Sequence, residues 1–98
     1  MSETYTVLWA QPARVDIKSL IRFLIDQDGG VMEAERHYLA LREAGESLVR
    51  LPERGRLGQV DNTRELVMRR LPYLLVYRVQ GRQVEILRVM HTSREPLQ

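Results

Sequence analysis

The chain has 98 residues with a net charge of +2, and 44% hydrophobic and 29% charged residues fit one ordinary globular domain spanning residues 1–98. The absence of cysteine excludes disulfides and thiolate metal sites, and two histidines are too few for a convincing zinc site, so we expect no metal or cofactor. No apolar run approaches the roughly 20 residues that cross a bilayer, and the N-terminus lacks a secretory pattern, so we expect a cytoplasmic protein without membrane contact.

The charge is divided unevenly along the chain. Residues 1–49 carry five Lys or Arg against eight Asp or Glu, a net charge of −3, whereas residues 50–98 carry ten Arg against five acidic residues, a net charge of +5. Arg outnumbers Lys by fourteen to one, and the planar Arg fork suits phosphates and carboxylates. A GC-rich genome explains part of this excess but not its segregation. The basic half therefore indicates an anionic partner, either nucleic acid or an acidic protein.

The first half of the chain predicts one strand and a helical hairpin. Alternation and β-branched or aromatic residues over 4–10 are typical of a strand. Apolar residues at helical spacing predict helices over 12–27 and 31–50, joined by a short Gly-Gly turn. Gly45 lies in the second helix and is expected to weaken its last turn by about 1 kcal/mol relative to Ala. The stripe on the first helix consists of Ile17, Leu20, Ile21, Leu24 and Ile25.

The second half predicts a loop and three strands. Two glycines, a proline and a polar turn make residues 51–62 a glycine-hinged loop. Strands are expected over 63–70, 73–79 and 83–90, the last two joined by a tight turn at Gly81. The order is β-α-α-β-β-β, which predicts an α+β fold with the helical hairpin on one face of an antiparallel sheet.

Strand alternation assigns the basic side chains to faces. Over the predicted strand 63–70, Arg64 and Arg70 share one face and Arg69 lies on the other. Over 83–90, alternation groups Val84, Ile86, Arg88 and Met90 on one face, opposite Glu85, Leu87 and Val89. Both faces are partly apolar, so the pattern leaves open which face packs against the helices.

The segment "LPERGRLGQVDNTRELVMRRLPYLLVYRVQGRQVEILRVMHTSREP", residues 51–96, resembles the C-terminal half of RelE/ParE superfamily toxins. These are plasmid-stabilisation proteins of type II toxin–antitoxin modules. The resemblance depends on the "GRxG" loop, the "TREL" strand start, the "PYLLVYRV" strand and "VEILRVMH" ending in His91. Residues 4–50 fit the family's β-α-α start more loosely.

The resemblance implies a small toxin that a cognate antitoxin holds inactive in a toxin–antitoxin hetero-oligomer. RelE-like members of the family cleave mRNA in the ribosomal A site, whereas ParE-like members inhibit DNA gyrase without nuclease activity. We expect a RelE-like ribosome-dependent mRNA endoribonuclease that blocks translation. The alternative is a ParE-like inhibitor of DNA gyrase, and a third reading is an RNA-binding domain without catalysis or an antitoxin.

RNA cleavage needs an acid, a base and cations that stabilise the charged transition state. The predicted catalytic residues are Arg64, Arg70 and His91. The resemblance implies a phosphate-binding Arg at position 64 and a catalytic residue at position 91, and an imidazole titrates near pH 6.5. The predicted substrate-binding residues are Arg54, Arg56, Arg78 and Arg88 on phosphate, and Tyr73 and Tyr77 stacked on a base.

Each candidate also has a purely structural explanation. A histidine at a strand end often only forms hydrogen bonds, Arg64 can pair across strands together with Glu65, and the two tyrosines are more often core or rim residues. His37, with charged neighbours in the second helix, is expected to be solvated and without a role. The end "HTSREPLQ" lacks the basic and aromatic tail of strong RelE nucleases, and Lys18 is the one Lys. Both departures favour the gyrase alternative.

Overall fold

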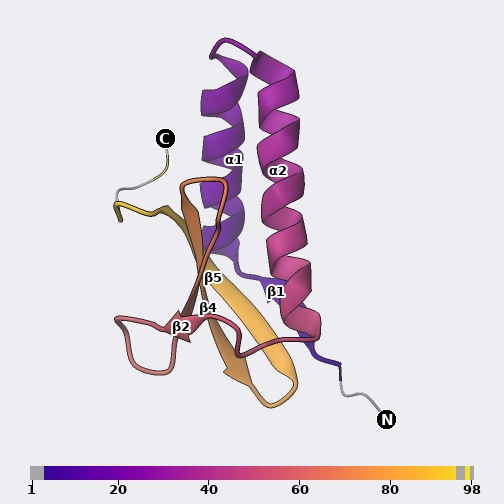
Figure 1. The fold of residues 1–98 in the computed structure, drawn as a ribbon, viewed down its shortest axis with the longest axis vertical. Coiled ribbons are helices and arrows are strands. Elements are labelled where there is room, and N and C mark those ends of the chain that lie inside the picture. The colour runs from indigo at the N-terminus through magenta and orange to yellow at the C-terminus, as the bar shows by residue number, and fades with distance from the viewer. Residues whose placement is uncertain (1–3, 95–96, 98) are drawn as a thin grey trace.

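The computed structural model describes residues 4–94 and residue 97. It confirms an α+β fold in which a helical hairpin packs on a sheet, and the end of the hairpin extends beyond the sheet (Figure 1). The elements are β1 Thr6–Trp9, α1 Gln11–Ile25, α2 Gly30–Glu46, the 3₁₀ turn η1 Ser47–Val49, β2 Arg56–Leu57, β3 Arg64–Val67, β4 Tyr73–Gln80 and β5 Gln83–His91. Among the described residues, no helix is long and apolar enough to cross a membrane.

The sheet has the strand order β1-β5-β4-β3-β2. β1 lies parallel to β5 at one edge, whereas the other neighbouring strands are antiparallel. The prediction of antiparallel pairing was therefore wrong for β1, because alternation fixes the faces of a strand but not the direction of its partner. The predicted loop also contains a short strand, β2, which pairs with the start of β3.

The two glycines of the predicted loop are packing positions and not hinges. A Cβ on Gly55 would lie 2.7 Å from the Tyr77 hydroxyl and 2.9 Å from the Glu65 carbonyl oxygen, and one on Gly58 would overlap the Thr63 hydroxyl. The Gly55 N–H donates to the Tyr77 hydroxyl at 2.9 Å. The "GRxG" segment is therefore held against the sheet by the close approach of its backbone.

Helix α1 follows the predicted stripe, but the stripe is only partly buried. Pro12 lies in the first turn, where its missing N–H costs no helical hydrogen bond. Leu20 is buried in the core, whereas Ile17 and Ile21 are half-buried and Ile25 is 45% exposed. Part of the apolar face of α1 therefore lacks a covering element within the described chain.

Gly45 does not end α2, which continues to Glu46 and into η1. A Cβ at this position would overlap the Trp9 indole and would lie 3.1 Å from the Ile86 side chain. The glycine thus lets the indole of β1 lie against the α2 backbone. Close packing compensates for the low helix propensity that the sequence indicates.

A register shift in β5 rearranges its predicted faces. Val76 pairs with Arg88 but Tyr77 pairs with Ile86, so one extra residue lies in β5 at this point. Such a bulge reverses the alternation beyond it. Ile86 and Val89 therefore both enter the core, and the prediction that grouped Arg88 with Ile86 was wrong. The core lies between the helices and one sheet face and includes Ala13, Leu20, Leu41, Leu48, Leu66, Leu75, Tyr77, Val84, Ile86 and Val89.

Candidate functional site

Arg64 begins β3 directly opposite Tyr77 of β4. Its Nη1 donates to the carbonyl oxygens of Gly55 at 2.8 Å and Glu53 at 3.3 Å. The guanidinium is half-buried and links the segment before β2 to the sheet. It also lines a polar hollow of about 860 Å³ that Arg78 shares. Arg64 therefore holds its own loop and also borders this hollow.

His91 ends β5 opposite Tyr73. Its Nδ1 accepts the backbone N–H of Ser93 at 3.1 Å and lies 2.8 Å from the Ser93 hydroxyl. Because Nδ1 accepts a backbone N–H, the neutral ring carries its proton on Nε2. In the neutral form His91 therefore presents an N–H donor at Nε2 for a hydrogen bond to a substrate oxygen.

The hydrogen bonds and ion pairs of the described residues do not bring the three predicted catalytic residues together. Tyr77 and Tyr73, the partners of Arg64 and His91, are four residues apart on β4, which separates the two backbone positions by about 13 Å. Arg70 is exposed in the turn after β3, because that strand ends at Val67. The prediction that Arg64 and Arg70 share one face of a single strand was therefore wrong. No hydrogen bond joins any two of the three among the described residues.

Three of the four predicted phosphate-binding arginines are held by carboxylates. The pairs are Arg56–Glu65 at 3.0 Å, Arg78–Glu85 at 2.8 Å and Arg88–Asp16 at 2.8 Å. Each arginine side chain nevertheless remains 42–60% exposed. Arg54 is exposed between η1 and β2. These side chains first serve intramolecular pairing, which sequence spacing did not indicate.

Glu65 is a buried carboxylate that pairs with two arginines, which its position in the sequence did not indicate. Its side chain is 3% exposed, and Oε1 accepts from Arg94 at 2.6 Å and from Arg56 at 3.0 Å. These bonds, the one from Arg94 foremost, outweigh burial and hold the pKa of Glu65 below its ordinary value. The pairing fastens the segment after β5 to β2 and β3, and Arg94 has a left-handed backbone with φ of 67°.

Asp16 is the second carboxylate that sequence reasoning did not single out. It lies on α1, and its Oδ2 accepts the Val89 backbone N–H at 2.8 Å as well as the Arg88 guanidinium. β1 pairs with β5 only as far as Ile86. Asp16 therefore accepts a backbone N–H of β5 just beyond the end of its pairing with β1. This bond and the Arg88 pair fix α1 to the bulged part of β5.

Tyr73 and Tyr77 are core residues, 4% and 0% exposed, so neither ring can stack on a base in this conformation. Burial raises the pKa of both hydroxyls. The Tyr73 hydroxyl lies 2.7 Å from Nδ1 of His37, whose Nε2 lies 3.3 Å from Glu33. His37 is 8% exposed, so the prediction of a solvated side chain was wrong. The residue joins α2 to β4.

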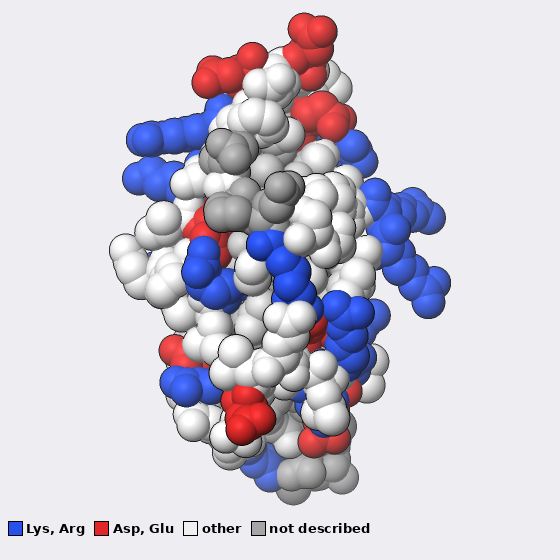
Figure 2. Space-filling view, turned by 90° about the vertical axis from the view of Figure 1, so that its left-hand side faces the viewer, with Lys and Arg blue, Asp and Glu red and all other residues white. Residues whose placement is uncertain are grey.

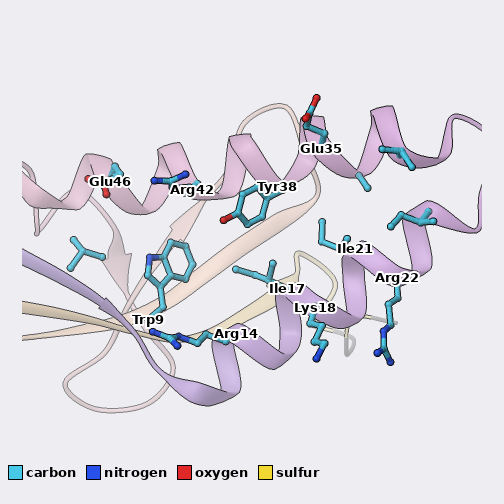
Figure 3. Close-up of a pocket in the computed structure, with 14 residues that line it drawn as sticks. Trp9, Arg14, Ile17, Lys18, Ile21, Arg22, Glu35, Tyr38, Arg42 and Glu46 are labelled. Carbon is cyan, nitrogen blue, oxygen red and sulfur yellow. The ribbon is translucent and has the colours of Figure 1, made fainter.

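An open groove runs between α1 and α2 beside β1, with a volume of about 1030 Å³ (Figure 3). Ile17 and Ile21 of α1 point toward Tyr38 of α2, and Trp9 closes the end near β1. The apolar lining residues are Val7, Trp9, Ile17, Ile21, Ile25, Val31, Ala34 and Tyr38. The lining of this groove is largely apolar, whereas the lining of the hollow beside Arg64 is polar.

Charged side chains border this groove on both sides. Arg14, Lys18 and Arg22 follow one another along α1 at intervals of four residues, and all three are exposed. The α2 side is mixed, with Glu35, Arg42 and Glu46. Within residues 4–94, none of these six side chains has a salt-bridge partner.

The surface charge does not form one continuous basic stripe on the face seen in Figure 2. Lys and Arg side chains are dispersed there, with acidic and uncharged side chains between them. Among the described residues, no three His, Asp or Glu side chains gather as metal ligands. On this face the basic side chains are therefore dispersed and do not form a single patch.

Comparison with known sequences identifies the same family along most of the chain. The family described as ParE toxin of type II toxin-antitoxin system, parDE, matches residues 7–96. Toxin RelE2 of Caulobacter vibrioides is 39% identical over 88 residues, which cover 90% of this chain and 96% of that protein. Putative toxin Y4kP of Sinorhizobium fredii is 36% identical over 77 residues, 72% of this chain and 79% of the other.

Two solved structures share the fold. The chromosomal ParDE TA system from P. aeruginosa superposes with a TM-score of 0.83 at 23% identity, covering 92% of this chain and 98% of that one. The toxin–antitoxin complex RelBE2 from Mycobacterium tuberculosis gives a TM-score of 0.67 at 29% identity, covering 93% and 94%. The first similarity, at this identity, supports the arrangement of helices and strands alone.

Proposed function

We propose that this chain, which belongs to the ParE toxin family of type II toxin–antitoxin systems, acts by binding and inhibiting DNA gyrase. From the sequence alone, mRNA cleavage is the first expectation and gyrase inhibition the alternative. The arrangement of the candidate side chains in the fold reverses this order.

The dispersed candidate site is the observation that carries the proposal. A general acid and the cations that stabilise a transition state must lie within hydrogen-bonding reach of one reacting phosphate. Arg64 and His91 begin about 13 Å apart along β4, and Arg64 is engaged by two carbonyl oxygens of its own loop. Paired arginines and buried tyrosines provide a rigid scaffold for binding and few groups for cleavage.

A cognate antitoxin is the proposed inhibitory partner. The RelBE2 structure, at 29% identity over nearly the whole chain, is described as a toxin–antitoxin complex. The open apolar groove between α1 and α2 gives such a partner a surface to cover. We expect the cellular form to be a cytoplasmic toxin–antitoxin hetero-oligomer.

Ribosome-dependent mRNA cleavage is the second candidate, and His91 supports it. The ring is half-buried at the end of β5, and Ser93 holds it in one tautomer with an N–H at Nε2. The neutral ring can donate a hydrogen bond to a leaving oxygen, and the protonated ring would serve as its acid. Arg54 and Arg70 are exposed, and the side chains of Arg56, Arg78 and Arg88 are partly exposed, so they remain predicted phosphate ligands under this mechanism.

Regulated expression of the full chain in bacteria distinguishes the two mechanisms. For gyrase inhibition we expect an SOS response and trapped gyrase–DNA breaks, with transcripts intact during the first minutes. Purified chain should also inhibit gyrase supercoiling in the absence of ribosomes. Cleaved transcripts at ribosomal A sites without DNA damage would refute the proposal.

His91→Ala is the decisive variant, because its side chain bonds only to the neighbouring Ser93 among the described contacts. Under gyrase inhibition its toxicity stays within about twofold of the wild type, whereas loss of a general acid lowers cleavage by roughly 100-fold or more. Thermal unfolding of the purified variant checks that it remains folded. Arg64→Ala is less informative, because it also frees the loop that Arg64 holds.

A further inference from the structure

An exposed apolar stripe runs along the outer side of α2. Tyr38 is 41% exposed and Leu39 53%, and they lie next to each other in the middle of this 17-residue helix. Met32, two helical turns before Leu39, is 82% exposed. Figure 1 shows that α1 flanks α2 on one side only. Large apolar side chains that stay in contact with water along one helix are typical of a protein-binding surface.

Two opposite charges lie at equal distances from the centre of this stripe. Glu35 comes three residues before Tyr38, and Arg42 comes three residues after Leu39, so the four positions share one helix face. Both charged side chains are exposed, and neither has a salt-bridge partner within residues 4–94. They cannot pair with each other, because seven residues separate them by about 10 Å along the helix axis. The face therefore has an acidic end, an apolar centre and a basic end.

Such a face is complementary to itself when two copies of α2 lie antiparallel. A two-fold axis through the midpoint between Tyr38 and Leu39 places Glu35 of one chain opposite Arg42 of the other. The same axis places Tyr38 opposite Leu39, and each contact occurs twice because the interface is symmetric. In a parallel pair, Glu35 would lie opposite Glu35 and Arg42 opposite Arg42, which is repulsive. The order of the four residues therefore favours the antiparallel arrangement alone.

We propose that this face of α2, which consists of Glu35, Tyr38, Leu39 and Arg42, is a self-association surface on which a second copy of the chain packs antiparallel. One helix of 17 residues, roughly 25 Å long, gives each copy a small contact area, so the dimer is weak and concentration-dependent. Glu35, Tyr38 and Arg42 also border the groove between α1 and α2. The dimer therefore shields apolar surface that a single chain leaves in water.

Charge reversal followed by mixing tests the pairing. In Glu35→Arg and in Arg42→Glu, both ion pairs of the dimer become like-charge contacts, so each variant alone should dimerise roughly tenfold or more weakly than the wild type. An equal mixture of the two variants restores opposite charges at both contacts, and a heterodimer should form with about the wild-type affinity. Sedimentation velocity from about 1 to about 500 μM chain measures these equilibria. A folding defect cannot be repaired by mixing.

Two matched variants control for net charge. Glu53→Arg and Arg69→Glu make the same changes in charge at exposed positions outside α2. Each should dimerise as the wild type does, and mixing them should add nothing.

The absence of native cysteine allows the orientation to be tested by cross-linking. In the antiparallel dimer the two copies of position 39 lie beside the two-fold axis, whereas the two copies of position 31 lie about 22 Å apart along the helices. A disulfide requires Cα atoms within about 7 Å. With oxidised glutathione, Leu39→Cys should therefore form a cross-linked dimer and Val31→Cys should not. Addition of Glu35→Arg to Leu39→Cys should suppress the cross-link.

Several outcomes would overturn the inference. One is a wild-type chain that remains a monomer at every concentration, since the stripe would then serve only a partner of different sequence. Others are a dimer that both single reversals leave intact, a mixture of the two variants that does not associate, and equal cross-linking at positions 31 and 39. All measurements use the purified chain without gyrase or ribosomes, so failure of the gyrase proposal leaves this result unchanged, and the reverse also holds.

Discussion

At the scale of single residues, the burial of a charge decides its effect more than its position in the sequence does. Glu65 is enclosed by two arginines from segments on either side of it in the chain, whereas Glu85 is 35% exposed beside Arg78. Exposed pairs contribute roughly 0–1 kcal/mol, and hydrogen bonds to a buried charge contribute about 1.5–3 kcal/mol. The two carboxylates therefore differ in importance although both pair with arginine.

Glu65→Gln should lower the free energy of unfolding by about 1–2 kcal/mol at pH 7, because a neutral amide accepts weaker hydrogen bonds from Arg94 and Arg56. The pKa of Glu65 is lower in the folded chain than its ordinary value of 4.5. Its stabilisation is therefore complete above about pH 4.5 and is lost as the pH falls through the folded pKa. Urea unfolding of the wild type and the variant from pH 7 to pH 3 measures this difference.

Glu85→Gln is the matched control and should change stability by less than about 0.5 kcal/mol. A Glu65→Gln difference that persists undiminished at pH 3, or an equal cost for the two variants, would contradict the assignment of Glu65 as the buried centre of charge.

At the scale of elements, close approach between β1 and α2 determines the shape of the groove floor. Gly45 permits the Trp9 indole to lie against the helix, and Ile86 of β5 packs at the same point. Helix propensity alone predicts that Gly45 destabilises α2. In the folded chain the same residue makes room for the Trp9 indole, so the tertiary contact offsets that local cost.

Gly45→Ala should destabilise the chain by about 1–3 kcal/mol, because the added methyl group overlaps the Trp9 ring in a packed site. In an exposed helix the same substitution stabilises by about 1 kcal/mol, so the sign of the change is diagnostic. Glu43→Ala, at an exposed position of α2, should be neutral or slightly stabilising. Denaturant unfolding followed by Trp9 emission measures both variants, and a more stable Gly45→Ala would show that the indole moves away at no cost.

At the scale of the whole molecule, the protein combines a rigid sheet with a hairpin that extends beyond it (Figure 1). β4 and β5 lie in the interior of the sheet and carry most of the fully buried side chains. The end of the hairpin has exposed Ile25, Val31 and Met32, the last at 82%. Local opening is easiest where few apolar groups are buried.

Amide hydrogen exchange should therefore be slowest in β4 and β5 and faster by about 100-fold or more at residues 26–32. Peptide-level mass spectrometry resolves these segments. Uniform protection along the chain would contradict this division of the molecule.

The sequence by itself determined the order of helices and strands, the α+β class and the family resemblance, because these depend on local periodicity and on contiguous motifs. The tertiary structure decided which charges meet. Pairing of Glu65 with Arg94 and of Asp16 with Arg88 depends on strand register, on the bulge in β5 and on how α1 crosses its edge. The roles of Arg64, Arg70 and His91 stay predictions. The separation of Arg64 and His91 follows from the strand register, which places them opposite Tyr77 and Tyr73 of β4.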